Sequence, residues 1–312
     1  MPWKGGYTIS DEKSLPDSAL WWPEGARCCF SVTVNLSVAR GPQGIEAKDL
    51  KTADAFFALN DGLETLTQVL RRRGFTATFS VPAVLAGRLE AALRELAAQG
   101  HEIAAGGFRH EDVSTLAREE EAARIAATTE ILARVTGERP SGWFSLPRQE
   151  DPFANGTISA HTMDLLIDAG YEWFGNGLAD DVPHWWVTDF ATRRAILALP
   201  YYYHFDDQFF ALFPAKGTGL ENTDSLSRNW RAEFDAQYKR GRHFSMTLHP
   251  RHSGWANRAE VLDRFLAYVR DLPGVWNPTA TACARHWKAA FPKGDHLDLQ
   301  PSIWVDYPGS LS

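Results

Sequence analysis

Residues 100–116 read GHEIAAGGFRHEDVSTL, and this stretch decides the fold class. Gly100 ends an Ala/Leu-rich helical pattern over residues 83–99, and the apolar run at 101–105 is typical of a short buried strand. A polar loop follows, and a second helical pattern covers residues 116–135. A strand between two helices, with a polar loop at its carboxyl end, is the repeating unit of an α/β protein.

The same alternation continues on both sides of this stretch. The segment RCCFSVTVNLSV at residues 27–38 is rich in β-branched and aromatic residues, which favours a buried strand, and helical spacing over residues 53–73 ends at Gly74. We expect further strands at 76–81, 142–145, 171–174, 196–200, 243–248 and 275–277, and further helices at 159–169, 225–240, 256–271 and 280–290. Such alternation predicts a parallel sheet covered by helices. No GxGxxG or P-loop pattern follows the first strand, so a nucleotide-binding fold has no support.

The composition is that of a globular protein built around one main domain. The chain has 312 residues, of which 44% are hydrophobic and 23% are charged, and α/β barrels often have this length as a single domain. We predict an N-terminal arm at residues 1–25, a barrel domain at 26–292 and a C-terminal extension at 293–312. The arm is Trp/Pro-rich without a period, so we expect it to lie on a surface.

Charge, targeting signals and cysteines limit the partners and the compartment. The net charge of −7 and the scattered basic residues argue against nucleic acid, and the basic triplet Arg71–Arg73 suits a helix end. No signal-peptide pattern and no membrane-spanning window is present, so we predict a cytoplasmic protein without a membrane partner. We expect Cys28, Cys29 and Cys283 to be buried reduced thiols, because neither a disulfide framework nor a CxxC or Cys/His zinc pattern appears.

Five segments occur in the order found in one known family. They are GHEIAAGGFRHEDVSTL itself, TATFSVP (76–82), RPSGW (139–143), DDVPHW (180–185) and TLHP (247–250). Over residues 27–287 the chain therefore resembles the NodB-homology polysaccharide-deacetylase family, which implies a distorted, seven-stranded (β/α) barrel. The GW and DDxPxW details, with RHW at 285–287, are most similar to the allantoinase and cyclic-imide-hydrolase branch. That resemblance implies cleavage of C–N bonds in small ring amides, in some members without metal, by a homodimer or homotetramer.

The chain departs from the family at the metal site. Family members place a general base and a metal ligand after the first strand, where this chain has TVNLSVA, so Asn35 takes the base position and Ser37 the ligand position. Gly106 stands at the first histidine of the family's metal pair, and only the second, His110, remains. Because Asn, Ser and Gly cannot replace carboxylate and imidazole ligands, we expect no metal and no other cofactor.

The resemblance places His110 in a strand-to-helix loop at the carboxyl-terminal rim, where barrel side chains line the active site. We expect His110, aided by Glu111 or Asp112, to position or activate water. The alternative is that His110 and Asp112 cap the next helix and brace the loop.

His249 matches the family's late histidine, the usual general acid. We expect it to protonate the leaving nitrogen, with a structural histidine as the alternative and His252 as a nearby substitute. Asn35 cannot be a base, but it can donate a hydrogen bond to the developing oxyanion together with backbone N–H groups.

Further residues are candidates for holding the substrate. Arg139 can clamp an anionic group or orient a carboxylate, and a structural ion pair is the alternative. Asp180 and Asp181 supply a base and its orienter, or shape a turn before Pro183. Aromatic faces near strand ends suit flat rings. The other predicted substrate contacts are Arg109, Trp143, Asp207, Trp185 and Tyr203.

Three functions follow from these residues. The first is metal-independent hydrolysis of a C–N bond in a small cyclic or linear amide, such as an imide, ureide or hydantoin-like ring. The second is a metal-dependent deacetylase of an N-acetylated sugar with displaced ligands, drawn from His110, His249 and an aspartate. The third is a catalytically silent barrel that binds a small ligand, which the changes at Asn35, Ser37 and Gly106 motivate.

Overall fold

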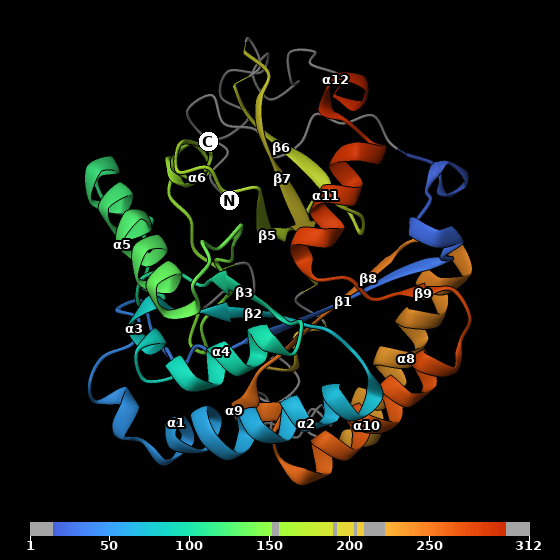
Figure 1. Cartoon of the computed structure of the whole chain (residues 1–312), viewed down its shortest axis with the longest axis horizontal. Coiled ribbons are helices and arrows are strands. Elements are labelled where there is room, and N and C mark those ends of the chain that lie inside the picture. The colour runs from blue at the N-terminus through green and yellow to red at the C-terminus, as the bar shows by residue number, and fades with distance from the viewer. Residues whose placement is uncertain (1–14, 152–155, 190–191, 203–204, 209–221, 298–312) are drawn as a thin grey trace.

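The computed structural model describes residues 15–151, 156–189, 192–202, 205–208 and 222–297. Its strands belong to one sheet (Figure 1). Their bounds are β1 Cys28–Asn35, β2 Thr78–Val81, β3 Glu102–Ala105, β4 Gly142–Trp143, β5 Trp173–Gly177, β6 His184–Asp189, β7 Arg194–Pro200, β8 His243–Leu248 and β9 Val275–Trp276.

Seven of these strands form one continuous parallel run, in the order β7-β5-β4-β3-β2-β1-β8. The short strand β9 extends the pairing of β1, and β6 pairs antiparallel with β7 outside the run. After β7, Asp206 makes a single parallel bridge to Thr247 of β8, so this segment lies between the two ends of the run. The seven parallel strands confirm the predicted α/β architecture.

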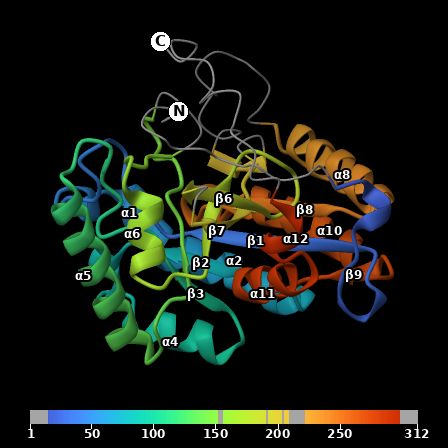
Figure 2. The same cartoon turned by 90° about the horizontal axis from the view of Figure 1, so that it is seen from above.

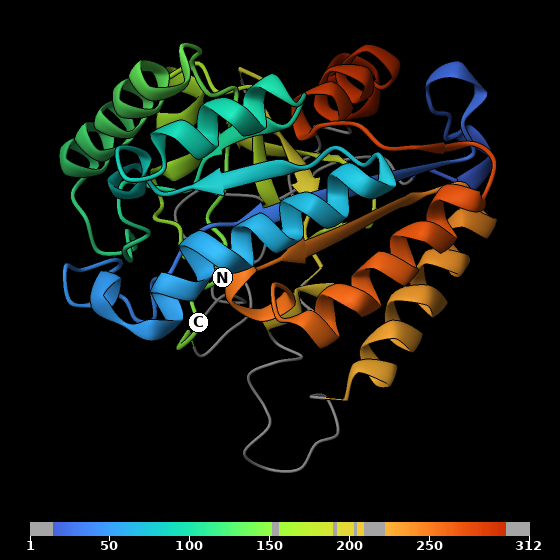
Figure 3. The ribbon, with the colours of Figure 1, turned by 60° about the horizontal axis from the view of Figure 1, so that its bottom comes forward.

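Helices cover the outside of the sheet. Their bounds are α1 Ala53–Phe57, α2 Leu63–Arg73, α3 Ala83–Ala86, α4 Glu90–Ala98, α5 Arg118–Thr136, α6 Thr162–Asp168, α8 Thr223–Arg240, α9 Pro250–Ser253, α10 Ala256–Asp271, α11 Ala280–Ala290 and α12 Lys293–His296. Short 3-10 turns cover Asp17–Ala19, Pro23–Gly25 and Asp49–Lys51. In Figure 2, α5 and α6 lie at one end of the sheet and α8 and α10 at the other. Figure 3 shows α10 between α2 and α8.

Strand β1 is buried on both faces because its residues alternate between two cores. Phe30, Val32 and Val34 belong to the larger core between the sheet and the outer helices. Cys29 belongs to the smaller core, with Trp173 and residues of α11. A strand that is apolar along its length and covered on both faces is typical of a parallel α/β sheet.

Helix α11 closes the amino-terminal ends of the strands. Its Ala280 N–H is bonded to Thr78 Oγ1 at 2.8 Å, and its Thr281 N–H donates to Glu102 Oε2 at 2.8 Å. Trp173, the first residue of β5, donates through Nε1 to Thr281 Oγ1 at 2.8 Å. These contacts at the starts of β2, β3 and β5 leave the opposite, carboxyl-terminal rim for a functional site.

The predicted arm is partly a core element. Trp22 is 2% exposed, packs in the smaller core and donates through Nε1 to the Gly241 carbonyl at 2.8 Å. This corrects the expectation that residues 1–25 only lie on a surface, for the part of the arm that the structure describes. The large apolar face of the indole ring explains the burial.

The predicted elements differ from the observed ones at several places. Strand β6 was not expected, and Pro183 directly precedes it. The helix predicted over 83–99 is divided into α3 and α4 around Gly87, because glycine is a poor helix former. The helix predicted over 53–73 contains a π-helical turn at Ala58–Gly62.

Several local predictions are confirmed. Arg72 and Arg73 at the end of α2 bind Asp263 of α10, so two residues of the basic triplet have a structural role. Gly74 ends α2 in the left-handed conformation, with φ of 67°. All three cysteines are buried and unpaired. Within the described part of the chain, no helix combines the length and the apolar character that crossing a membrane requires.

Candidate active site

Polar side chains gather where the parallel strands end at the carboxyl-terminal rim. Asn35 is the last residue of β1, and His249 directly follows β8. Asp206 and Asp207 follow β7, and His110 lies in the loop after β3. All five are buried, with 6% exposure or less. Barrel strands are far apart in sequence and meet at this rim, so the fold brings these residues together.

A carboxylate fixes the His249 ring. His249 Nδ1 lies 2.8 Å from Asp207 Oδ1, and the backbone N–H of His249 donates to both oxygens of Asp207 at 3.0 and 2.9 Å. Ser253 Oγ, in α9, donates to Asp207 Oδ2 at 2.6 Å. Four contacts around one carboxylate hold the imidazole in one orientation, as in other carboxylate–histidine pairs.

The backbone around Asn35 decides which His249 nitrogen carries the proton. The Ser37 N–H donates to Asn35 Oδ1 at 3.0 Å, so the Asn35 amide must turn its Nδ2 group toward His249 Nε2, 3.0 Å away. Since Nδ2 can only donate, Nε2 must present a lone pair, and Nδ1 carries the hydrogen that bonds to Asp207. In this arrangement His249 is a base at Nε2, whereas the sequence suggested a proton donor.

His110 is neutral and bound on both nitrogens. Nε2 lies 2.5 Å from the Leu146 carbonyl, which can only accept, so Nε2 carries the hydrogen. Nδ1 therefore accepts from Ser37 Oγ at 2.6 Å. Burial first, and then the Arg148 guanidinium, lowers the pKa of His110 to about 3. The φ of 60° at His110 is a left-handed conformation that non-glycine residues rarely adopt.

The two adjacent aspartates have opposite tendencies. Burial raises the pKa of Asp206 to about 6, although Tyr201 donates to its Oδ2 at 2.7 Å. Burial also acts on Asp207, but hydrogen bonds from His249 outweigh it and lower the pKa of that carboxyl. Asp207 is therefore the charged partner of the imidazole, and Asp206 is the carboxyl that takes up a proton near neutral pH.

Two buried arginines stand beside these groups, and the sequence did not single them out. Arg251, at the start of α9, donates to Gln208 Oε1 at 2.9 Å and to Gln149 Oε1 at 3.3 Å. Its Nε has no hydrogen-bond partner among the residues described here, and burial lowers the pKa of its guanidinium. Arg148 pairs with Asp151 at 2.9 Å and braces the His110 carbonyl at 3.3 Å. These two arginines differ from most of the other arginines by their burial in the folded chain, which no local sequence pattern predicts.

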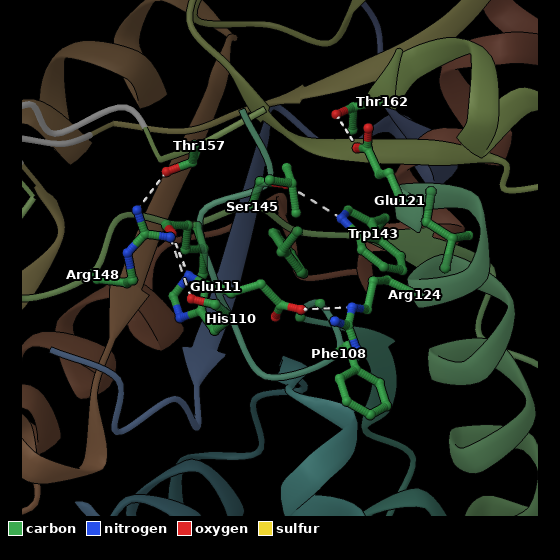
Figure 4. Close-up of a pocket in the computed structure, with 16 residues that line it drawn as sticks. Phe108, His110, Glu111, Glu121, Arg124, Trp143, Ser145, Arg148, Thr157 and Thr162 are labelled. Carbon is green, nitrogen blue, oxygen red and sulfur yellow. Dashed lines mark hydrogen bonds and ion pairs between the residues drawn. The ribbon is translucent and has the colours of Figure 1, made fainter. Parts of the chain in front are cut away.

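A narrow cavity lies behind His110, between the loops after β3 and β4 and helix α5 (Figure 4). Glu111 turns into it, with Oε1 3.5 Å from Arg124 Nε and Oε2 bonded to the Arg109 N–H at 2.9 Å. Trp143 lines the same cavity and donates to Ser145 Oγ at 3.3 Å. Its free volume of about 30 Å³ has room for one or two waters and not for a ring substrate.

Two predicted residues have structural roles in the described chain. Asp112 Oδ1 accepts a hydrogen bond from the Ser114 N–H at 2.8 Å and so stabilises a turn within the loop. Among the residues that the structure describes, Asp112 makes no hydrogen bond to His110. Glu111 faces Arg124 rather than His249. These contacts support the bracing alternative for the loop.

Two predicted substrate contacts lie away from the rim. Arg139 precedes β4, at the amino-terminal end of the strands, where it bonds to the Ala169 carbonyl and covers the Tyr171 ring at 5.5 Å. Trp185 lies in β6 and donates to the Phe291 carbonyl at 3.3 Å in the smaller core. Their expected substrate contacts are therefore corrected. Arg139 precedes a strand and so lies at the end opposite the rim, whereas the Trp185 ring is buried in the smaller core. Tyr203 lies outside the described residues.

Asp180 and Asp181 belong to an ion-pair network. Arg242 Nη2 lies 2.7 Å from Asp180 Oδ1, and Arg242 also binds Asp181 and Asp17. Gln237 Nε2 donates to Asp181 Oδ2 at 2.9 Å. Arg242 directly precedes β8, so the network lies at the amino-terminal end of that strand and not at the rim.

The donors at the rim do not fit the metal site of the resembling family. A Cβ atom at Gly106 would lie 2.6 Å from Ser80 Oγ and 3.1 Å from backbone atoms of Val81, so no histidine fits there without a shift. Both nitrogens of His110 are already bonded. Asp206, Asp207 and His249 do have ligand atoms within 4.8 Å of one another, but His249 Nδ1 needs its proton for Asp207.

Comparisons with known proteins agree with this architecture. A family model described as polysaccharide deacetylase matches residues 51–173. The peptidoglycan deacetylase of Helicobacter pylori is 20% identical across 75% of this chain and 86% of its own length. A relative from Schizosaccharomyces pombe, described as a "putative polysaccharide deacetylase", is 27% identical, and the match spans 36% of this chain and only 38% of that protein.

Two solved structures cover nearly the whole chain. The PuuE allantoinase superimposes with a TM-score of 0.74 at 23% identity, over 90% of this chain and 95% of its own. A protein from Mycobacterium smegmatis, with the same description as the Schizosaccharomyces relative, gives 0.71 at 26% identity, over 91% and 95%. These likenesses confirm the NodB-type (β/α) barrel predicted from the sequence.

Proposed function

We propose that this chain hydrolyses a C–N bond in a small cyclic or linear amide without a tightly held metal. The premise is the match of residues 51–173 to a family model described as polysaccharide deacetylase. The substrate class is an imide, a ureide or a hydantoin-like ring. The observation that carries the proposal is the hydrogen-bonded series Asp207–His249–Asn35 at the ends of β7, β8 and β1.

The series supplies a base and then an acid. His249 Nε2 takes a proton from water while the water oxygen forms a bond to the amide carbon. The Asp207 carboxylate stabilises the imidazolium that results. The C–N bond then breaks, and the same proton passes from Nε2 to the leaving nitrogen. One histidine thus performs both proton transfers, and no second carboxylate is needed at the Asn35 position.

Asn35 changes its partner during this cycle. When Nε2 is protonated, it no longer accepts from Asn35 Nδ2, and this N–H group is released. An amide N–H beside the reacting carbon stabilises the oxyanion of the tetrahedral intermediate. The proposal keeps the predicted oxyanion role of Asn35. His110 is hydrogen-bonded at both nitrogens, so in this proposal it positions Ser37 and does not activate water.

Arg251 replaces Arg139 as the cation proposed to bind the substrate. It lies close enough to His110 to lower the pKa of that histidine, and its Nε is unpartnered within the described chain. A buried guanidinium with a free N–H suits a second carbonyl oxygen of an imide or ureide. The expected result of Arg251→Lys is a rise in KM that exceeds the loss of kcat, because Lys lacks the planar fork.

Turnover measurements test the proposal. The purified chain is assayed with cyclic imides, ureides and N-acetylated sugars, with and without chelator. We expect ring-amide turnover that survives chelator and falls by about 10²–10⁴-fold in His249→Ala. Absence of turnover on every substrate would favour the silent, ligand-binding barrel.

The metal-dependent deacetylase is the second candidate, because Asp206, Asp207 and His249 have ligand atoms within 4.8 Å of one another. It requires His249 Nδ1 to give up the proton that it shares with Asp207. It predicts deacetylation of an N-acetylated sugar that chelator abolishes, and a bound metal that Asp206→Ala removes. Activity on sugars that is insensitive to chelator would contradict it.

We also propose that the chain acts as a homo-oligomer in the cytoplasm with a small molecule as its partner. Light scattering of the purified chain measures the mass of the assembly. A mass equal to one chain of 34.8 kDa would contradict the oligomer.

A further inference from the structure

A second cluster of reactive side chains lies at the other end of the barrel. Cys29 of β1 and His243 of β8 are paired in register, and Cys283 comes from α11. Their ligand atoms all lie within 4.8 Å of one another, and the side chains are 0–1% exposed. Cys29 and Asn35 are six residues apart on β1, a distance of about 20 Å, so this cluster is separate from the rim.

The distance between the sulfurs matches a tetrahedral ion site. Cys29 Sγ and Cys283 Sγ lie 3.9 Å apart. Two thiolates that bind one zinc ion at about 2.3 Å with a tetrahedral angle are separated by about 3.8 Å. A disulfide needs about 2.05 Å, so the two sulfurs are not bonded, and their spacing fits two ligands of one ion as well as an S–H···S hydrogen bond between two thiols.

The third member of the cluster has a free buried nitrogen. Ser31 Oγ lies 2.8 Å from His243 Nε2, whereas His243 Nδ1 has no hydrogen-bond partner in the described part of the chain. An unpartnered polar atom in a buried ring is costly. A histidine that binds a metal through one nitrogen and a hydrogen-bond partner through the other is the usual arrangement at zinc sites.

We propose that Cys29, Cys283 and His243 bind one divalent, thiophilic cation, with zinc as the natural probe. Binding releases the two thiol protons to solvent, and the two thiolates then cancel the charge of the ion. A neutral set suits a buried position, because an uncompensated charge there is expensive. Ser31 Oγ orients His243 and also lies 3.9 Å from Cys29 Sγ.

The ion would have a structural role. It joins the amino-terminal ends of β1 and β8 to α11, the helix that closes this end of the barrel. The three ligands are far apart in the sequence, so no CxxC or Cys/His motif marks them. The site also affects the interpretation of metal analysis, because zinc found in the purified chain need not be at the catalytic rim.

Cobalt provides the test, since Co²⁺ bound by thiolates absorbs in the near ultraviolet. The full chain is produced in minimal medium with Co²⁺, so that the ion enters during folding, and is purified without chelator. We expect about one Co²⁺ per chain with thiolate absorption, and its loss in Cys29→Ala and Cys283→Ala. Cys28→Ala is the matched control, because the neighbouring Cys28 is equally buried but belongs to the other core, and it should keep the ion.

Two results would overturn the proposal without relying on a variant that folds. One is wild-type chain with three free thiols after unfolding and no metal. The other is a wild-type mass 2 Da below that of the reduced chain, which shows a Cys29–Cys283 disulfide in place of an ion. Retention of thiolate absorption in both cysteine variants would also contradict it, because the ion would then be elsewhere.

Discussion

At the scale of single residues, the orientation of one amide defines the chemistry of the candidate site. The Ser37 N–H holds Asn35 Oδ1, and the Asn35 Nδ2 group therefore faces His249 Nε2. A carboxylate at the same position would accept from Nε2 instead of donating to it. The family's acid and this chain's amide thus favour opposite tautomers of the histidine, which gives the substitution a chemical meaning beyond the loss of a ligand.

The tautomer is open to measurement. In the wild-type chain, ¹⁵N NMR of labelled histidine should show a hydrogen on Nδ1 of His249 and a lone pair on Nε2. In Asn35→Asp, we expect Nε2 to carry a hydrogen at pH 7, because an acceptor has replaced the donor. Ser37→Ala keeps the backbone N–H and serves as the control. An Nε2–H signal in wild type would contradict the base role of His249.

Asp206 makes stability depend on pH with a definite sign. Its pKa is about 6 in the folded chain and near 3.8 when unfolded, so between these values the folded state binds more protons. Stability contributed by Asp206 therefore falls as pH rises from about 4 to about 6. Asp206→Asn should remove this contribution, which urea unfolding of both chains at pH 4.5 and 7 measures. Equal pH dependence in the two chains would contradict the assignment.

At the scale of elements, strands β2 and β3 approach too closely for a side chain at Gly106. A Cβ there would lie 2.6 Å from Ser80 Oγ, so a larger side chain, such as the histidine that the resembling family has at this position, would require a shift of its neighbours. The contact is between two elements, so it is tested by changing both.

Gly106→Ala should destabilise the fold by about 1–3 kcal/mol through overpacking. In a Ser80→Gly background the same change should cost less, because its nearest clash is gone, although Val81 backbone atoms remain at 3.1 Å. A double-mutant cycle by chemical unfolding measures the difference. Costs that add without coupling would contradict a direct contact.

Sequence patterns predicted the elements well where periodicity was strong. The predicted bounds of α10, α11 and β8 match the observed ones, because the two helices have long apolar periods and β8 is bounded by Gly241 and Pro250. Strand β6 was not predicted, because its antiparallel pairing with β7 forms only in the folded chain. At the site, the resemblance led to Asn35 and His249, whereas Arg251 and the Cys29–Cys283–His243 cluster depend on which strands become neighbours, which no local pattern contains.

At the scale of the whole molecule, the burial of neutral histidines makes the free energy of unfolding decrease as the pH falls. Burial lowers the pKa of four histidines to about 3 or 4, well below the ordinary value of 6.5. These residues are His110, His184, His243 and His252. In the unfolded chain each takes up a proton below about pH 6.5, so the unfolded state gains protons that the folded state does not.

The melting temperature should therefore fall steeply as pH decreases from about 6.5 to about 4. Scanning calorimetry across this range measures the effect, and His184→Gln should reduce the slope. His184 is a suitable choice because it lies in β6, outside the candidate site, with its pKa lowered to about 4 by burial. A slope unchanged in His184→Gln would contradict its contribution.

Strand β1 lies between β2 and β8. Asn35, at the end of β1, is hydrogen-bonded to His249, which lies 214 residues further along the chain. During synthesis on the ribosome, β1 emerges early and can pair with β2 soon afterwards. Its other edge stays open until residue 248 has left the exit tunnel, because β8 is the strand that covers it. The nascent chain thus exposes an unpaired apolar strand for most of its synthesis, a state in which edges aggregate and chaperones bind. Both ends of β1, the rim at Asn35 and the thiol at Cys29, wait for this late strand, and the proposed ion site also waits for Cys283 of α11, so the candidate active site can form before the ion site does.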